Sequence, residues 1–246
     1  MDKVAKITGS VSVDKLNVEH LRRISEPVKK LVEAGLVLAI QQDQDGLRSS
    51  KISLENGKLY LHTLLYQPLS AHARTIQLSE VMDELDSSST LAFLDLGWAG
   101  ATRGRIHIRL RPSTGLARQF VLMCTGQQGP TYANTKLVSV GYKSRPGEYV
   151  AGGDYQYNDG RGGTPLLFDL LGEYRRSGSA GAVWSPRQLG DLSTQFCIIT
   201  RDRTDGHQWG DVFGEVENGL DVLKAAVKLR NINEVTVVDC GLVLTL

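Results

Sequence analysis

The hydrophobic and polar positions near the N-terminus predict two short helices. Asn17, a residue type that caps helix N-termini, precedes a helical pattern over residues 18–23. Ser25 and Pro27 indicate a break and a second helix start, because proline fits only the first turn of a helix. Gly35 then marks the end of this second helix.

The pattern next changes to strands. Residues 36–40 form an apolar run typical of a buried strand, and residues 41–46 are expected to form a polar turn. Alternating apolar residues flank Asn56 and Gly57, which predicts a tight hairpin, since both central residues of such a turn take positive φ. Residues 78–85 return to helical spacing. These elements together predict a small α+β unit.

Strands separated by regularly spaced turns dominate the rest of the chain. Residues 91–96 and 104–110 are expected to pair as a hairpin with one buried face, because apolar and charged residues alternate along the second strand. Residues 113–124 have the spacing of an amphipathic helix. The pattern is typical of an antiparallel barrel or sandwich.

A chain of 246 residues allows one large domain, or one ordinary domain with an appended segment. The serine run at residues 87–89 indicates where such a division falls. We therefore predict a small α+β unit over residues 1–89, of no recognised family, and a mainly β domain over residues 90–246.

The charge balance excludes several kinds of partner. The chain carries 28 basic and 27 acidic residues, a net charge of +1, so no nucleic-acid partner and no anionic membrane surface is expected. No apolar run approaches the roughly 18 residues of a spanning helix. The three cysteines are widely spaced and odd in number, which favours a reducing compartment, the cytoplasm or the nucleus.

The scattered polar residues suggest no cofactor and no metal. The five histidines lack metal-ligand spacing, and the sequence contains no Gly-x-Ser-x-Gly elbow. The glycine-rich residues 160–163 lack the Lys-Ser/Thr ending of a phosphate-binding loop. We predict neither a cofactor nor a metal site.

Several motifs after residue 90 resemble, in the same order, those of the cyclophilins, the peptidyl-prolyl isomerases. No single glycine among them is specific, and the shared order is the signal. The motifs lie at residues 124–129, 146–147, 152–155, 158–163, 194–200, 212–216, 217–224 and 238–241. The resemblance covers about residues 90–246 and implies a closed antiparallel β-barrel with two capping helices.

The resemblance also implies where the isomerase site would lie. In the family, an arginine before the Pro-Gly pair catalyses the rotation, and apolar side chains hold the proline ring. Residue by residue, Lys143 takes the arginine position. Glu148 and Tyr149 take the positions of a pocket phenylalanine and methionine, and Ala151 takes that of an orienting glutamine.

The second half of the implied site is equally altered. Gln195 matches a family glutamine, while Cys197 replaces a pocket phenylalanine. His207 and Trp209 are candidates from the following loop, with His207 alternatively a solvent-exposed loop residue. The candidate peptide-binding residues are Tyr149, Ala151, Gln195, Cys197 and His207.

Arg145 is the alternative to Lys143 as a source of the catalytic guanidinium. It lies two residues further along the chain, which moves a side chain by about 7 Å on an extended segment. Lysine is a mobile point charge that lacks the planar fork of a guanidinium. We therefore assign no catalytic residue and interpret Arg145 as a surface residue.

Three hypotheses follow for the function. The first is a catalytically impaired cyclophilin-like domain, a pseudoenzyme that binds a protein or a proline-containing peptide, within a larger multidomain protein. The second is an active peptidyl-prolyl isomerase with an altered pocket. The third is a scaffold whose N-terminal unit, residues 1–89, makes the partner contact. The changes at Lys143, Ala151 and Cys197 favour the first and third hypotheses.

Overall fold

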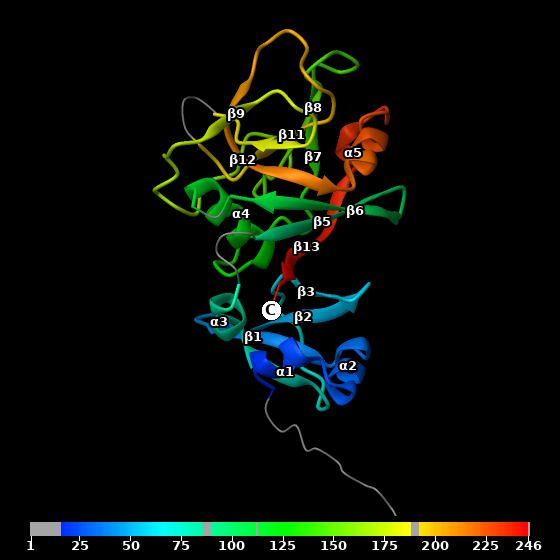
Figure 1. Cartoon of the computed structure of the whole chain (residues 1–246), viewed down its shortest axis with the longest axis vertical. Helices are drawn as coiled ribbons and strands as arrows, with labels where there is room; N and C mark the ends of the chain where they lie inside the picture. The colour runs from blue at the N-terminus through cyan, green and yellow to red at the C-terminus, as the bar shows by residue number, and fades with distance from the viewer. Residues whose placement is uncertain (1–15, 86–89, 112, 188–191, 246) are drawn as a thin grey trace, which may run out of the picture.

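The computed structural model describes residues 16–85, 90–111, 113–187 and 192–245, and Figure 1 shows their arrangement. Within the described residues, the N-terminal part contains three helices and four strands. Its elements are α1 (Val18–Arg23), α2 (Glu26–Glu33), β1 (Val37–Asp43), β2 (Gly46–Glu55), β3 (Lys58–His62), β4 (Arg74–Gln77) and α3 (Leu78–Asp83).

The remaining elements are mostly strands, which confirms a mainly β fold with few helices. They are β5 (Leu91–Trp98), β6 (Ala101–Leu110), α4 (Gly115–Thr125), β7 (Leu137–Gly141), β8 (Tyr149–Gly152), β9 (Arg175–Ser177), β10 (Ala182–Trp184), β11 (Phe196–Ile199), β12 (Trp209–Asn218), α5 (Leu220–Ala226), the 3₁₀ turn η1 (Ile232–Glu234) and β13 (Thr236–Leu244).

Local signals in the sequence produce the predicted elements. The Asn17 side chain accepts a hydrogen bond from the backbone N–H of His20 at 3.1 Å, as expected for a helix cap. Asn56 and Gly57 both take positive φ, 51° and 76°, and join β2 to β3 as a two-residue hairpin. The division predicted at residues 87–89 lies outside the described residues.

One expected turn is shorter than predicted. Gln41 and Gln42 belong to β1, which pairs with β2 as far as Asp43 and Gly46. The side-chain amide of Gln41 donates to the backbone carbonyl of Gln127 at 2.9 Å, so a polar residue is used inside the strand. The polarity of residues 41–43 therefore did not indicate a turn.

The two parts of the molecule share one sheet. Its order is β4-β1-β2-β3-β13-β5-β6-β12-β10-β11-β8-β7, with β9 paired to β12. Strand β13 connects the two parts, because β3 pairs with its last residues, Gly241 to Leu244, while β5 pairs along nearly its whole length. The end of the chain therefore lies in the middle of the molecule (Figure 1).

The closed barrel expected from the sequence is not confirmed. The sheet order ends at β7. Among the described residues, the only β-bridge between β13 and the segment around β7 is an isolated antiparallel bridge that joins Lys136 to Thr236. The Leu137 N–H donates to the Val235 carbonyl at 3.0 Å beside it. From Gly241 onward, β13 pairs with β3 on one edge and with β5 on the other. Only the first residues of β13 therefore have an edge free to pair with the segment around β7.

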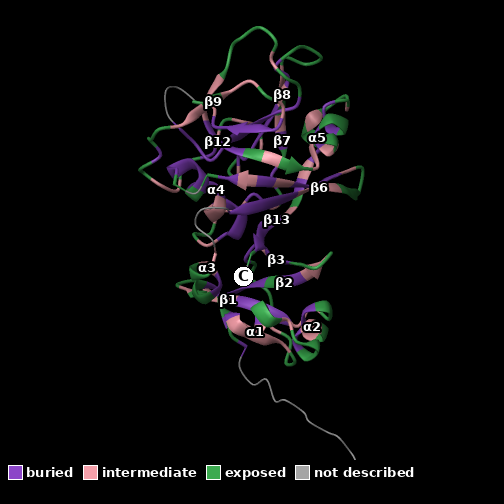
Figure 2. Ribbon diagram, viewed as in Figure 1, coloured by how far each residue is buried: buried purple, intermediate pink, exposed green. Residues whose placement is uncertain are grey.

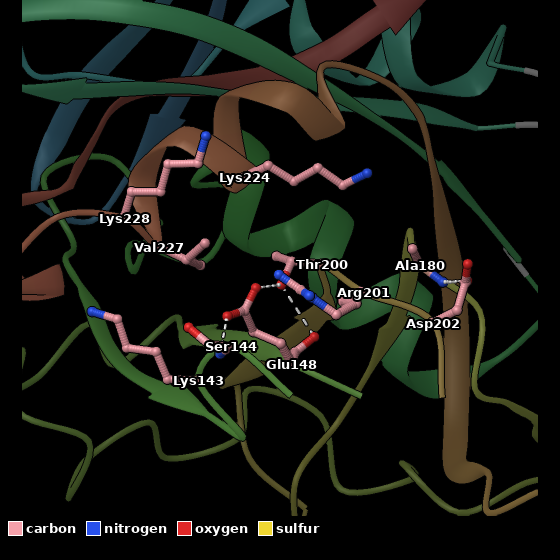
Figure 3. Close-up of a pocket in the computed structure, with 10 residues that line it drawn as sticks. All are labelled: Lys143, Ser144, Glu148, Ala180, Thr200, Arg201, Asp202, Lys224, Val227 and Lys228. Atoms are coloured by element: carbon pink, nitrogen blue, oxygen red, sulfur yellow. Dashed lines mark hydrogen bonds between the residues drawn. The ribbon is translucent and has the colours of Figure 1, made fainter. Parts of the chain in front are cut away.

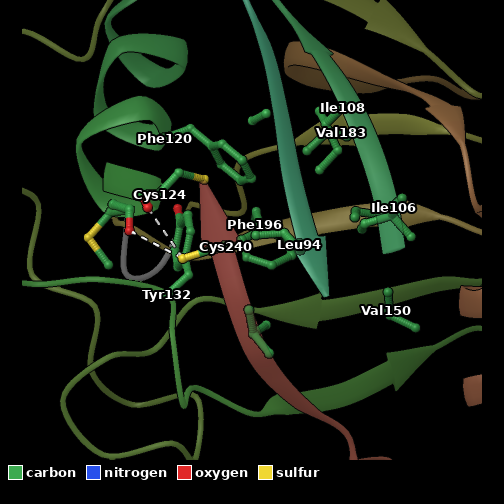
Figure 4. Close-up of a cluster of buried hydrophobic side chains, with 14 of the residues drawn as sticks. Leu94, Ile106, Ile108, Phe120, Cys124, Tyr132, Val150, Val183, Phe196 and Cys240 are labelled. Atoms are coloured by element: carbon green, nitrogen blue, oxygen red, sulfur yellow. Dashed lines mark hydrogen bonds between the residues drawn. The ribbon is translucent and has the colours of Figure 1, made fainter. Parts of the chain in front are cut away.

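The two largest groups of buried apolar side chains among the described residues lie one in each part (Figure 2). The larger group lies under α4, where Phe120, Tyr132 and Phe196 meet with ring centroids 4.9 to 5.5 Å apart (Figure 4). The smaller group lies between α1, α2, α3 and the strands β1 to β3, and it includes Leu244 from the end of β13. No helix in the described residues is long and apolar enough to cross a membrane.

Candidate functional site

Neighbouring strands bring three of the predicted site residues together. Ala151 on β8 pairs directly with Cys197 on β11, and Cys197 pairs in turn with Trp184 on β10. Side chains that lie opposite each other in paired strands point to the same face of a sheet. Tyr149 shares this face with Ala151, because it lies two residues before it on β8.

Four aromatic rings cover this face, and we call Tyr142, Tyr149, Trp184 and Trp209 the aromatic cluster. The indoles of Trp184 and Trp209 stack with ring centroids 4.5 Å apart and planes 5° from parallel. The ring of Tyr149 meets each indole edge-on at 5.5 Å, and Tyr142 lies 6.0 Å from Trp209. Such stacked and edge-to-face contacts are the favoured geometries of aromatic pairs.

A β-bulge sets the position of the two tryptophans. Val183 on β10 pairs with Gly214 on β12, but Trp184 pairs with Val212, so one extra residue of β12 lies between these pairs. Asp211, just before Val212, takes a positive φ of 52°. Bulges turn side chains out of the regular alternation, and this one places the indoles of β10 and β12 against each other.

The aromatic cluster buries the floor of the site. Cys197 is 1% exposed, Ala151 7% and Trp184 8%. Burial raises the pKa of the Cys197 thiol far above its usual 9.0. The indole nitrogens of Trp184 and Trp209 are also buried and have no hydrogen-bond acceptor among the described residues. The face that the resemblance assigns to the proline ring is therefore filled by the protein's own side chains.

Arg203 lies over the outer side of the aromatic cluster. Its guanidinium is 4.9 Å from the Trp209 ring centroid and 5.4 Å from that of Tyr142. The guanidinium also pairs with Asp205 at 2.7 Å, and this hydrogen bond raises the pKa of Arg203 and lowers that of Asp205. A cation of the chain thus occupies the aromatic surface.

Lys143 lies on the turn between β7 and β8, and it lines a cavity to which the aromatic cluster does not contribute. Its ammonium group donates to the backbone carbonyl of Leu229, just after α5, at 3.0 Å. Figure 3 shows Lys143 at the wall of a pocket that Val227 and Lys228 also line. A guanidinium at the prolyl nitrogen is the catalytic group that the resemblance implies, and Lys143 does not project toward that face.

Glu148 is buried next to Lys143 rather than among the aromatic rings. Its carboxylate accepts hydrogen bonds from the backbone N–H of Ser144 at 2.7 Å and from the Thr200 hydroxyl at 2.9 Å (Figure 3). These donors replace the water that a buried carboxylate would lose. Glu148, which the resemblance places at a pocket phenylalanine, therefore lines a different cavity from the one covered by the aromatic rings.

Gln195 is engaged by the glycine-rich loop. Its side-chain amide donates to the carbonyls of Gly160 and Gly162 at 3.0 and 2.6 Å. The loop is organised by Asp154, which accepts backbone N–H groups from five residues: Gln156, Tyr157, Asp159, Gly160 and Gly162. Burial opposes ionisation of Asp154, but these hydrogen bonds lower its pKa overall.

Two further residues considered from the sequence, His207 and Arg145, do not belong to the aromatic cluster. His207 is exposed, with its Nδ1 3.5 Å from the Asp205 carboxylate, and Arg145 is exposed in the turn after Lys143. Trp184 and Arg203 were not among the candidates. Trp184 lies directly opposite Cys197 on the neighbouring strand, and only the pairing of β10 with β11 reveals that place.

Comparisons with known proteins agree with this architecture. A protein-family model described as "Cyclophilin type peptidyl-prolyl cis-trans isomerase/CLD" matches residues 94–242. The chain is also similar to the crystal structure of the Mimivirus cyclophilin, with 20% sequence identity and a TM-score of 0.50. That match covers 66% of this chain and 94% of the viral one, and it shows a shared fold. Because the family model spans more than half of the sequence, the chain belongs to the cyclophilin-type peptidyl-prolyl cis-trans isomerase family.

Proposed function

We propose that this protein is a catalytically impaired member of its family that binds a protein or peptide. One observation carries the proposal: the stacked indoles of Trp184 and Trp209 lie over Cys197, where the family holds the proline ring. A substrate ring would have to displace two tryptophans whose contacts with each other and with Tyr149 are already made.

The chemistry of the reaction supports the impairment. The barrier to rotation about a prolyl bond is about 18–20 kcal/mol, and lowering it requires a donor held rigidly at the prolyl nitrogen as conjugation is lost. Lys143 donates instead to the Leu229 carbonyl. A displacement of about 1 Å can already cost 100-fold in rate, so a lysine aimed elsewhere leaves the reaction without its electrostatic catalyst.

Exposed apolar side chains support the binding role. The segment between β8 and β9 presents Phe168, which is fully exposed, and Leu171, which is 70% exposed. Contiguous exposed apolar side chains on a soluble protein mark interaction sites more often than single ones do. We place the partner contact at this segment, and its ligand is a protein surface or peptide with apolar side chains.

An isomerase assay tests the impairment. With a proline-containing tetrapeptide and either protease coupling or exchange NMR, we expect acceleration at least tenfold below that of ordinary cyclophilins. Activity within tenfold, a difference of about 1.4 kcal/mol in the barrier, would overturn the proposal in favour of an active isomerase with an altered pocket. Lys143→Arg is the matched variant, and we expect it to restore no activity while the aromatic cluster stays in place.

A partner screen with the full chain tests the binding role. We expect partners captured by the wild-type protein to be lost with Phe168→Ser/Leu171→Ser and kept with Lys30→Glu, an exposed charge change on α2. The reverse pattern would favour the scaffold hypothesis, in which the N-terminal part binds. The full chain is needed because β3 pairs with β13, and separated halves would each expose an unpaired strand edge.

A further inference from the structure

A cavity separate from the face under the aromatic cluster lies at the turn that carries Lys143. It has a volume of about 660 Å³ and is bounded by this turn, the residues after β11 and helix α5 (Figure 3). We call it the basic pocket, because four cationic side chains line it: Lys143, Arg201, Lys224 and Lys228. The aromatic cluster contributes none of its walls.

The charge of the basic pocket is not balanced within it. Its acidic lining residues are Glu148 and Asp202, so four cations face two carboxylates and the lining carries a net charge of +2. The whole chain carries only +1. Both carboxylates are satisfied by uncharged donors, Glu148 by Ser144 and Thr200, and Asp202 by the Ala180 N–H at 2.7 Å.

The cations themselves lack anionic partners. Within the described residues, the side chains of Arg201, Lys224 and Lys228 make no ion pair or hydrogen bond, and Lys143 donates only to a backbone carbonyl. Lys224 and Lys228 lie four residues apart, and like charges at this helical spacing repel each other. Clustered cations in a concave surface focus a positive potential, so a bound anion would relieve the repulsion.

The walls of the basic pocket are held in place by Glu148. Its carboxylate connects the turn, through the Ser144 N–H, to the end of β11, through the Thr200 hydroxyl, and its own carbonyl accepts the N–H of Thr200 at 2.7 Å. Ser144 takes a positive φ of 64° in this arrangement. The cations therefore project from a fixed frame, with α5 supplying Lys224, the turn after it Lys228, and two other loops Lys143 and Arg201.

We propose that the basic pocket binds a phosphomonoester. Such a group carries a charge of about −1.5 to −2 at pH 7 and three acceptor oxygens, which matches the net +2 of the lining. The Arg201 guanidinium can pair with two of the oxygens, and the lysines act as point charges around the third. The phosphomonoester is either a phosphorylated side chain of a partner protein or a free phosphate ester.

NMR titration of the ¹⁵N-labelled full chain distinguishes these sources. The probes are a capped alanine pentapeptide with a central phosphoserine, the same peptide with serine or glutamate, and glycerol 3-phosphate. We expect both phosphate probes to shift the amides of residues 143–145, 147–148, 200–202 and 220–228. Tighter binding of the phosphopeptide than of glycerol 3-phosphate would identify a phosphorylated protein, and equal binding would identify a free ester.

Matched variants make the test specific. We expect Lys224→Ala/Lys228→Ala and, on a different element, Arg201→Gln to weaken phosphate binding at least tenfold. Lys30→Ala/Lys58→Ala, which removes two exposed lysines from the N-terminal part, is expected to change nothing. Circular dichroism of each variant verifies that it is folded. Three results would each overturn the proposal. The first is no shift at about 10 mM probe, a concentration that detects even very weak binding, and the second is identical shifts with the serine peptide. The third is wild-type affinity in both Lys224→Ala/Lys228→Ala and Arg201→Gln.

Discussion

The indole rings of Trp184 and Trp209 lie parallel, 4.5 Å apart, on strands that a bulge brings out of register. This pair covers the face that the resemblance to the family assigns to the proline ring. The closure depends on three strands, because β10 carries one indole, β12 the other, and β11 the cysteine beneath them. Any test of the site therefore begins with these rings.

Removal of Trp209 is expected to uncover Cys197. In the wild-type protein Cys124, Cys197 and Cys240 are all buried, so native protein should react slowly with a water-soluble disulfide reagent. Trp209→Ala takes away the outer indole, and one thiol should then react at least tenfold faster. Cys197→Ser in the same background should abolish the gain.

Trp98→Ala is the matched control for that experiment. Trp98 is also partly buried, but it packs at the end of β5 beside Arg103, away from Cys197. If this variant gains the same reactivity, general loosening of the fold rather than the aromatic cluster explains the exposure. Unchanged reactivity in Trp209→Ala would mean that other side chains cover the sulfur.

Gly241→Ala is expected to destabilise the junction of the two parts. Gly241 lies between His62 on β3 and Phe93 on β5, and an added Cβ would overlap the Leu61 carbonyl oxygen and the Phe93 ring. Overpacking of this kind costs about 1–3 kcal/mol or more. Urea unfolding measures the loss, and Gly210→Ala, where a Cβ meets nothing within 4 Å, should change stability little.

Asp154→Asn should cost stability at neutral pH and much less in acid. The pKa of Asp154 is lowered below its usual 3.8, so its ionised form contributes stability above pH 4 that is lost as the pH falls through the folded-state pKa. Each hydrogen bond to a charged group contributes about 1.5–3 kcal/mol, and we expect a loss of at least about 2 kcal/mol at pH 7. Urea titrations at pH 7 and pH 3 measure both differences, and an equal loss at the two values would contradict the assignment.

His107 should make the fold less stable in mild acid. Burial, together with the charges of Arg105 and Lys58, lowers the pKa of His107 below its usual 6.5. As the pH falls below 6.5 the unfolded chain binds the proton first, so folding stability declines until the lower folded-state pKa is passed. His107→Gln removes this decline, which we expect to amount to only about 0.5 kcal/mol between pH 7.5 and 5.5, since solvent screens the group.

His72→Gln is the control for the histidine prediction, because His72 is exposed on the segment before β4. Its pH dependence of stability should match that of the wild-type protein. Should His107→Gln show the same slope as wild type, the hydrogen bond between the Tyr60 hydroxyl and His107 Nε2, at 3.2 Å, would have to stabilise both protonation states equally.

The sequence by itself determined the elements whose causes are local. Asn17 caps α1 through its own neighbour, and Asn56 with Gly57 closes a hairpin because both accept positive φ. The alternation in residues 104–110 produces a strand, β6, with Ile106 and Ile108 buried. The ordered glycine motifs predicted the family, since each motif depends on backbone geometry that spans only a few residues.

Only the tertiary structure decided what the site contains. Trp184 and Trp209 are 25 residues apart, and their contact requires the β10–β12 pairing and its bulge. Lys143 reaches Leu229 only because α5 packs beside the turn. Strand β3 pairs with β13 although most of the sequence separates them. Long-range pairing and side-chain direction follow from the sum of many weak contacts rather than from any local pattern. The sequence therefore located the candidate positions, and the packing determined which of them lie in the aromatic cluster and which line the basic pocket.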